Sequence, residues 1–219
     1  MNRSKSNLLL KYKRTIVSSL FLLLFTLGVN AKGAAGMVLY FNDGHQTFLL
    51  LADDIEGTRG WSAFGGRQEE GESIVEAAAR ETAEETRGFY SKEWLMLQVE
   101  GQTPVSTSNG FKMFFVEVPF VPALRIKQHP LPYNADKASQ ERVHFAWVPL
   151  SNLEQAIHSD KNEIIDLYLP ASSKLKFYWD VWINNMKDAY AVNACPWQKL
   201  KSLDYSMNST ENQNYRLSP

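Results

Sequence analysis

The segment that most constrains the fold is residues 73–86, whose pattern predicts a helix with a defined start. Ser73 can accept a hydrogen bond from the first turn, and Glu76 completes a capping box with it. The alanines at 77–79 are strong helix formers. Gly88 suits the left-handed conformation that ends many helices. We therefore expect a helix with one face at the edge of a packed core.

The end of this helix carries Arg80 and three carboxylates, Glu81, Glu84 and Glu85. At about 100° per residue, the three carboxylates share one face. Like charges four residues apart destabilise a helix by a few tenths of a kcal/mol, and the helix dipole disfavours anions near its C-terminus. Such a cluster indicates a neutralising partner, and a hard cation with oxygen ligands is the natural candidate. Arg80 is expected to hold part of the charge and to fix one carboxylate.

Two features that precede the helix extend this candidate site. Gly66 allows the backbone to approach closely, so its carbonyl can turn toward a ligand. Glu72 is expected to hold the loop, with contact to a second metal as the weaker alternative. An acidic helix alone is more typical of a solvated face with salt bridges than of a metal site. The spacing between Gly66, Glu72 and the acidic turn is what favours a metal site.

The sequences GRQEEGE at 66–72 and RETAEE at 80–85 resemble the Nudix box of the Nudix hydrolase family. Six defined positions are met at the family's spacing. Thr82 stands where the family usually has an aliphatic residue. Arg87 stands where the box usually has glycine, with Gly88 one place late. Neither position is a metal ligand, so the departures concern the end of the helix more than the chemistry.

The resemblance covers roughly residues 36–157 and implies both a fold and a reaction. The fold is α/β, a Nudix-type α/β/α sandwich with a mixed sheet. The order of strands, one helix, strands and then helices independently favours an α/β domain. The implied reaction is hydrolysis of the diphosphate linkage of a nucleoside diphosphate joined to another group. The implied cofactor is Mg²⁺, with Mn²⁺ as an alternative, and a metal-activated water would attack phosphorus.

The resemblance also assigns roles to single residues. The implied metal ligands are the Gly66 carbonyl, Glu81, Glu84 and Glu85. Arg80 is expected to orient Glu81. A carboxylate near the metal would take the proton of the attacking water. Glu81 is one candidate for this base and Glu141 is the other, although Glu141 is alternatively a salt-bridge partner of Arg142.

Residues 1–31 differ from the rest of the chain. They hold five basic residues and no acidic residue, followed by an almost unbroken apolar run at 15–29 and small residues at Val29 and Ala31. This order is typical of a secretory signal peptide, and the run is shorter than the roughly 20 residues of a membrane span. We therefore expect export to the periplasm or medium. The alternatives are an uncleaved membrane anchor and a cytoplasmic protein that starts at Met37.

Charge limits the partners of the mature chain. Without residues 1–31, 18 basic residues face 24 acidic residues, which gives a net charge of −6. A protein of this sign has no electrostatic basis for gripping a nucleic-acid duplex. The expected partner is a nucleotide-like small molecule, and membrane contact would come only through an uncleaved N-terminal segment. The alternatives to an enzyme are a Nudix-like nucleotide-binding module and a membrane-anchored interaction module.

The remaining chain is expected to form one domain at 32–190 and a polar, disordered tail at 191–219. Cys195 is expected to be a packed small side chain. Five aromatic residues are candidates for stacking on a base, with core packing as their commoner role: Trp61, Phe64, Phe111, Tyr133 and Trp147. Strands are expected at 36–41, 47–52, 61–64, 95–103, 111–118 and 143–148. Further helices are expected at 151–158 and 175–189, with loop at 119–133.

Overall fold

The computed structural model describes the central part of the chain. The described residues are 33–54, 57–131, 133, 135, 138–159 and 161–198. The leader predicted at residues 1–31 lies outside them, and so does the tail after residue 198. None of the helices in these ranges has the length and apolar character that crossing a membrane requires.

The described residues form a mixed six-stranded sheet. Its strands are β1 (Ala34–Asn42), β2 (Thr47–Asp54), β3 (Phe64–Arg67), β4 (Val105–Ser106), β5 (Lys112–Glu117) and β6 (Arg142–Pro149). The order is β4-β5-β1-β2-β6, and β3 pairs with the first half of β1. Strand β1 runs parallel to β5 and antiparallel to β2 and β3. The mixed sheet expected from the sequence is therefore confirmed.

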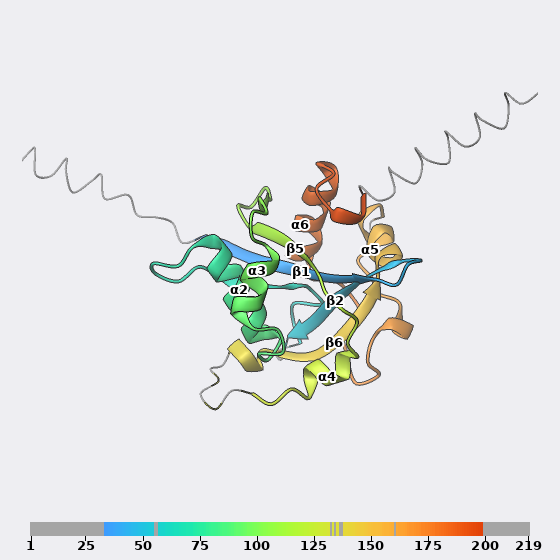
Figure 1. Cartoon of the computed structure of the whole chain (residues 1–219). Coiled ribbons are helices and arrows are strands. Elements are labelled where there is room, and N and C mark those ends of the chain that lie inside the picture. The colour runs from blue at the N-terminus through green and yellow to red at the C-terminus, as the bar shows by residue number, and fades with distance from the viewer. Residues whose placement is uncertain are drawn as a thin grey trace, which may run out of the picture. The chain divides into compact units, whose positions relative to one another are not determined.

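Helices cover both faces of this sheet (Figure 1). They are α2 (Ile74–Glu85), α3 (Lys92–Gln98), α4 (Ala123–Lys127), α5 (Leu150–Ile157) and α6 (Asp180–Ala191), with short 3₁₀ turns η1 (Ala138–Gln140) and η2 (Asp166–Tyr168). The core under α2, α3 and α4 contains Met37, Leu39 and Leu50. The core under α5 and α6 contains Val38, Leu49 and Leu51. Alternate residues of β1 and β2 thus face opposite cores, which makes an α/β/α sandwich.

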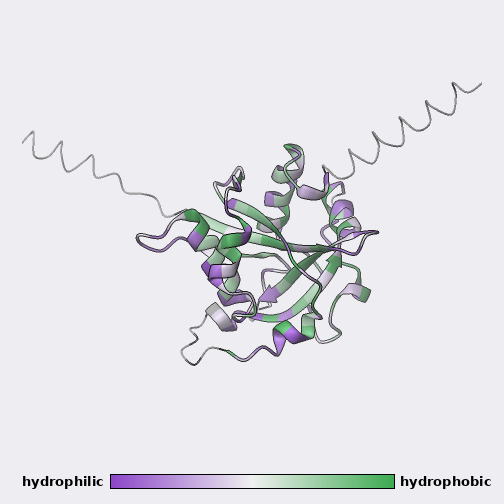
Figure 2. Ribbon diagram, viewed as in Figure 1, coloured by the Kyte–Doolittle hydropathy of each residue, from purple (hydrophilic) through white to green (hydrophobic). Residues whose placement is uncertain are grey.

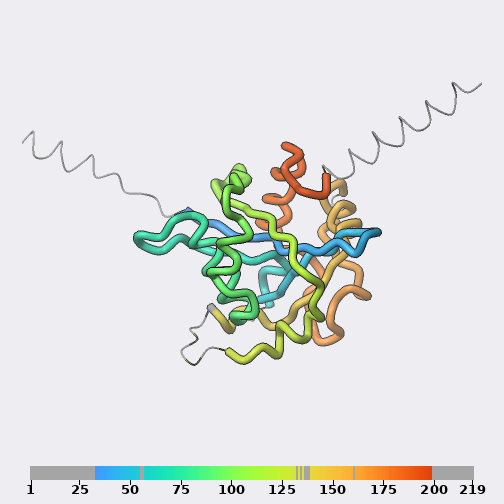
Figure 3. Tube along the Cα trace, in the orientation of Figure 1, coloured from blue at the N-terminus to red at the C-terminus, as the bar shows by residue number. Residues whose placement is uncertain are grey.

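Apolar residues follow this layering, as Figure 2 shows by the green strands between the helices. The layer with α6 extends past the helix. Cys195 and Trp197 are buried, and the Trp197 ring contacts Tyr40 and Phe115. Figure 3 shows this last described segment turning back after α6. The packed domain therefore continues to at least residue 198, beyond the expected boundary at 190, and Cys195 is a buried side chain as expected.

Several sequence-based assignments are wrong. The strand expected at 95–103 is instead α3, because Ser91 caps a helix by accepting from the Trp94 N–H. Leu95 and Val99 are buried while Leu97 is 66% exposed, which is a helical pattern and not a strand pattern. Helix α6 begins at 180 and not at 175, and α4 lies within the expected loop. Strand β3 runs through the two glycines at which a strand was expected to stop.

Helix α2 agrees with its prediction at the start and differs at its end. The capping box between Ser73 and Glu76 is formed on both sides. Gly88 has the expected positive φ of 75°, but Arg87 also adopts a left-handed φ of 61°. Its side chain donates to the His129 carbonyl at 3.2 Å. Thr82 is fully buried and its hydroxyl donates to the Ala78 carbonyl, so an aliphatic residue is not required there.

Candidate active site

The loop before α2 is closed by its own side chains. Glu72 accepts a hydrogen bond from the Glu69 N–H at 3.0 Å, and the Gln68 amide donates to the Glu72 carbonyl. The oxygen of the same Gln68 amide accepts from the Gly33 N–H at 3.1 Å, immediately before β1. The role expected for Glu72, holding the loop, agrees with these contacts. The loop therefore presents the start of α2 in a fixed position against β1 and β3.

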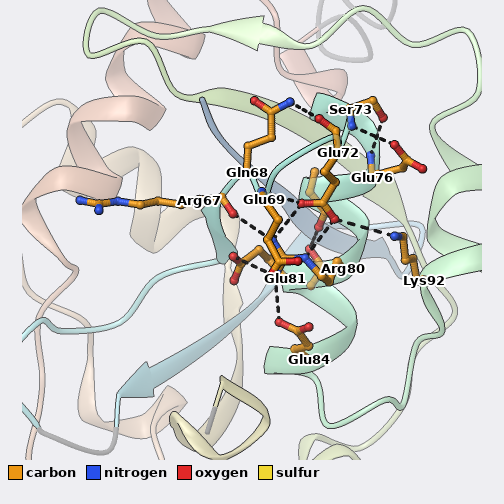
Figure 4. Close-up of polar contacts among 12 residues, drawn as sticks. Arg67, Gln68, Glu69, Glu72, Ser73, Glu76, Arg80, Glu81, Glu84 and Lys92 are labelled. Atoms are coloured by element: carbon orange, nitrogen blue, oxygen red, sulfur yellow. Dashed lines mark hydrogen bonds and ion pairs between the residues drawn. The ribbon is translucent and has the colours of Figure 1, made fainter. Parts of the chain in front are cut away.

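Arg80 is the centre of the charged cluster, as Figure 4 shows. Its guanidinium contacts Glu72 at 3.0 Å, Glu81 at 3.1 Å and Glu84 at 3.1 Å, and donates to the Arg67 carbonyl at 2.9 Å. Burial opposes the charge of Arg80, but the three carboxylates outweigh it and raise its pKa. Arg80 therefore forms ion pairs with three carboxylates. It also links the loop, through Glu72, to β3, through the Arg67 carbonyl.

Glu81 lies directly against the backbone of β3. A Cβ atom added at Gly66 would sit 2.3 Å from the Glu81 Cδ atom, so only glycine leaves room for this carboxylate. Burial raises the pKa of Glu81 to about 7, with Arg80 opposing the shift and Glu85 and Glu84 adding to it. The negative charge on Glu81 is therefore incompletely compensated by the protein.

Glu85 is held differently from Glu81. It is 4% exposed, and it accepts from the Arg142 Nε at 2.8 Å and from the Gly65 N–H at 2.9 Å. Arg142 also donates to the Ala63 carbonyl at 3.3 Å. Burial raises the pKa of Glu85, while Arg142 and the Gly65 N–H offset part of this effect. This contact ties the end of α2 to β6 and to β3.

Glu84 and Glu141 complete the set of residues proposed from the sequence. Glu84 is partly exposed and pairs with Arg80 one helical turn earlier. Glu141 is exposed and contributes to the raised pKa of Glu85, so the structure brings it near the acidic turn. Its neighbour Arg142 pairs with Glu85 and not with Glu141. The sequence showed Arg142 only as an alternative partner of Glu141, although an arginine opening an apolar strand signals a buried charge.

The donor set fits a hard cation in its chemistry. The carboxylates of one helical turn and the backbone at Gly66 offer only oxygen ligands, which suit Mg²⁺ and Mn²⁺. All three carboxylates contact an arginine, and Glu81 also lies against Gly66. Within the described ranges, no three His, Cys, Asp or Glu side chains already converge as a metal site. Arg80 and Arg142 therefore neutralise part of the negative charge that a bound cation would also neutralise.

The aromatic residues considered for base stacking divide into two groups. Trp61 and Phe64 are buried in the two cores, and Phe111 packs against one of them. Trp147 is half-buried, and its indole donates to the Val121 carbonyl at 2.7 Å. Tyr133 is fully exposed. Core packing therefore accounts for Trp61 and Phe64, the two that were nearest to the acidic helix in sequence.

Fold and site together define an α/β/α sandwich whose acidic helix is tied to a glycine-containing strand. A family model described as the NUDIX domain matches residues 31–168, more than half of the chain. The chain belongs to the Nudix family. As a member with the acidic turn intact, it is a Nudix-type pyrophosphohydrolase acting on phosphorus-containing anhydrides.

Solved structures similar to this chain were also found. An Ap4A hydrolase from C. elegans, in a binary complex, is 22% identical, with a TM-score of 0.36 over 57% of this chain and 83% of that chain. A mutT/nudix family protein from Listeria innocua is 16% identical, with a TM-score of 0.36 over 74% of this chain and 94% of that chain. A NUDIX hydrolase from Nitrosomonas europaea is 18% identical, with a TM-score of 0.34 over 73% and 88%. A comparison with curated proteins gives no match.

Proposed function

We propose that the protein is a Mg²⁺-dependent hydrolase of the diphosphate linkage in a nucleoside diphosphate joined to another group, with Mn²⁺ as an alternative cation. The observation that carries this proposal is the close packing of the Glu81 carboxylate against Gly66, beside Arg80 and the other carboxylates of the same helical turn. Burial, which raises the pKa of Glu81 to about 7, supports it. A cation at this position would neutralise the diphosphate and lower the pKa of the attacking water.

The chain's own residues would hold the cation and keep its surroundings rigid. The proposed ligands are the Gly66 carbonyl, Glu81, Glu84 and Glu85. Arg80 would position Glu81 and Glu84, since it contacts both at 3.1 Å. Arg142 would position Glu85, and it keeps this carboxylate beside β3. Each of the three carboxylate ligands therefore has an arginine that limits its rotation before a cation binds.

Glu81 is also the better candidate for the general base. A base works best when its pKa lies near the operating pH, and burial brings Glu81 to about 7. Glu141 is the alternative, because it is exposed beside the acidic turn and free of the Arg142 pair. A carboxylate that binds a cation loses basicity, so the two roles of Glu81 compete. Comparing the Mg²⁺ affinity and the kcat of Glu81→Gln and Glu141→Gln would separate them.

The proposal is tested with a panel of nucleotides. The panel should contain nucleoside diphosphates joined to a sugar, to a second nucleotide or to a further phosphate, each with and without Mg²⁺, with product analysis by mass spectrometry. We expect Mg²⁺-dependent cleavage inside a diphosphate linkage, giving two phosphate-bearing products. Nucleotide binding without turnover would instead support the non-catalytic binding module. A folded protein that binds no nucleotide would support the interaction module.

We also propose that residues 1–31 direct export and are then removed. The pairing of residues 34–36 with β3 supports a chain that begins before Met37, because a start at Met37 would delete three of the four residue pairs between β1 and β3. Mass spectrometry of the mature N-terminus is the test. Lys32 is the expected first residue, whereas Met1 would indicate an anchor and Met37 a cytoplasmic start.

A further inference from the structure

A second polar cluster lies away from the acidic helix. Asp53 of β2 accepts from the Nδ1 atom of His144 on β6 at 2.8 Å. The other ring nitrogen of His144, Nε2, lies 2.9 Å from the hydroxyl oxygen of Ser172. Asp53 is 3% exposed, His144 is partly exposed and Ser172 is exposed. The three side chains thus form one chain of contacts from the protein interior to its surface.

The hydrogen bonds of Asp53 assign the proton on the His144 ring. The carboxylate also accepts from the His144 backbone N–H at 2.8 Å and from the Ser173 hydroxyl at 2.9 Å. A carboxylate offers acceptors only, so the Nδ1 atom that faces it must carry a hydrogen. The neutral ring then has a lone pair on Nε2, which accepts from the Ser172 hydroxyl. In this neutral tautomer the Ser172 hydroxyl donates to Nε2, which can act as its base.

We propose that Ser172, His144 and Asp53 form a second hydrolytic site, which cleaves small acyl esters by way of an acyl-serine. A nucleophilic serine, a histidine base and a buried carboxylate in this order of contact recur on unrelated folds and are identified by geometry. Ser172 and His144 are the catalytic residues, and Asp53 is a positioning residue. The exposed position of Ser172 suits a small, unhindered ester.

The site is separate from the acidic helix because of an irregularity in β6. Ala52 pairs with Phe145 and Asp54 pairs with Arg142, so residues 143 and 144 stand opposite Asp53 alone. This bulge lets Arg142 reach Glu85 of α2 while His144 lies with Asp53 on the other face. Ser172 comes from the segment after η2, which packs on the α5 and α6 side through Leu175.

The reaction balances within these residues and water. The Ser172 oxygen bonds to the acyl carbon and passes its proton to Nε2 of His144. The bond between the acyl carbon and the alcohol oxygen breaks, and that oxygen takes the proton from Nε2. Water then attacks the acyl-serine, its proton passes to Nε2, and the Ser172 oxygen leaves and regains a proton. Asp53 keeps the ring oriented and stabilises its protonated form.

The test is labelling of the full chain with a fluorophosphonate probe, together with hydrolysis of p-nitrophenyl acetate. We expect the label on Ser172 by peptide mass spectrometry, in the presence of EDTA as well as Mg²⁺. Ser172→Ala should abolish labelling, and His144→Gln should slow it by about 100-fold or more. Ser108→Ala is the matched control, since Ser108 is also exposed but its contact is with Asp188.

The Asp53→Asn variant must be tested by a measurement that distinguishes orientation of the His144 ring from a general loss of structure. Nitrogen NMR of the wild-type ring should show the hydrogen on Nδ1 of His144, and the variant should lose this preference along with the labelling. Folding is checked by circular dichroism, and Ser172→Ala is expected to fold because its side chain is exposed. No label on a folded wild-type chain, a label on another serine, or full labelling of His144→Gln would each overturn the proposal.

Discussion

Glu81 and Glu85 lie one turn apart on the same face of α2, yet the protein treats them differently. Glu85 accepts from Arg142 and from the Gly65 N–H, shares neither with another carboxylate in the described part of the chain, and is almost fully buried. Glu81 shares Arg80 with Glu72 and Glu84 and lies against Gly66. The difference teaches that a carboxylate with its own arginine anchors the helix. One that shares its arginine is only partly compensated, so a proton or a cation can neutralise it.

The largest effect should come from removing the charge of Glu81. Glu81→Gln keeps the shape of the side chain and should lower Mg²⁺-dependent kcat by about 10²- to 10⁴-fold, as expected for loss of a general base or ligand. Steady-state product release measures this, with melting curves to check the fold. Glu70→Gln is the matched control, because Glu70 is an exposed loop carboxylate. If Glu81→Gln kept the wild-type kcat, Glu81 would be neither a ligand nor a base, and the proposed difference between Glu81 and Glu85 would be wrong.

Removing the partner of Glu85 should act first on stability. Arg142→Ala leaves a buried carboxylate without its cation, and should lower the free energy of unfolding by about 3–5 kcal/mol. Urea unfolding measures this. Arg125→Ala, at an exposed arginine of α4, should change it by less than about 0.5 kcal/mol. Glu85→Gln should therefore lower both stability and activity. A fully stable Arg142→Ala protein would show that the pair does not anchor the helix.

The close approach at Gly66 gives a third way to test the comparison. Gly66→Ala places a Cβ atom where the Glu81 carboxylate lies, and that flexible side chain must move. A displacement of about 1 Å is expected to reduce kcat by about 100-fold, with a smaller effect on stability. Steady-state kinetics of Gly66→Ala, Glu81→Ala and the double variant measure the coupling. If the Gly66→Ala change acts through Glu81, the double variant should be no slower than Glu81→Ala.

The smallest effect concerns stability without metal. The pKa of Glu81 is raised to about 7 in the folded chain, so the folded state keeps a proton that the unfolded state has lost. This group therefore makes the protein less stable as pH rises from about 4.5 to 7. Urea unfolding in EDTA should show a fall of about 1–2 kcal/mol, allowing for solvent screening, that Glu81→Gln lacks. Parallel pH profiles for both proteins would contradict the raised pKa.

Sequence patterns within a few residues predicted helix α2 correctly but could not predict the contacts that Arg142 and His144 make. The helix from Ser73, its capping box and its acidic face depend on neighbours within a few residues, and these were predicted correctly. The contact between Glu85 and Arg142 joins residues 57 positions apart, and that between Asp53 and His144 joins residues 91 apart. Such pairs depend on strand order, which no local pattern contains. Helix α3 was missed because a short apolar run fits either period.

The bulge in β6 has a consequence for changes in the length of the chain. Residue 143 is the extra residue of the bulge, because residues 143 and 144 together oppose only Asp53. Deleting this single codon would straighten the strand and still leave Arg142 facing α2 and His144 facing Asp53. Deleting one codon after Phe145 would shift the register and turn half of the strand inside out. Among related sequences, we therefore expect single-residue insertions and deletions in β6 at position 143 and not at its other positions.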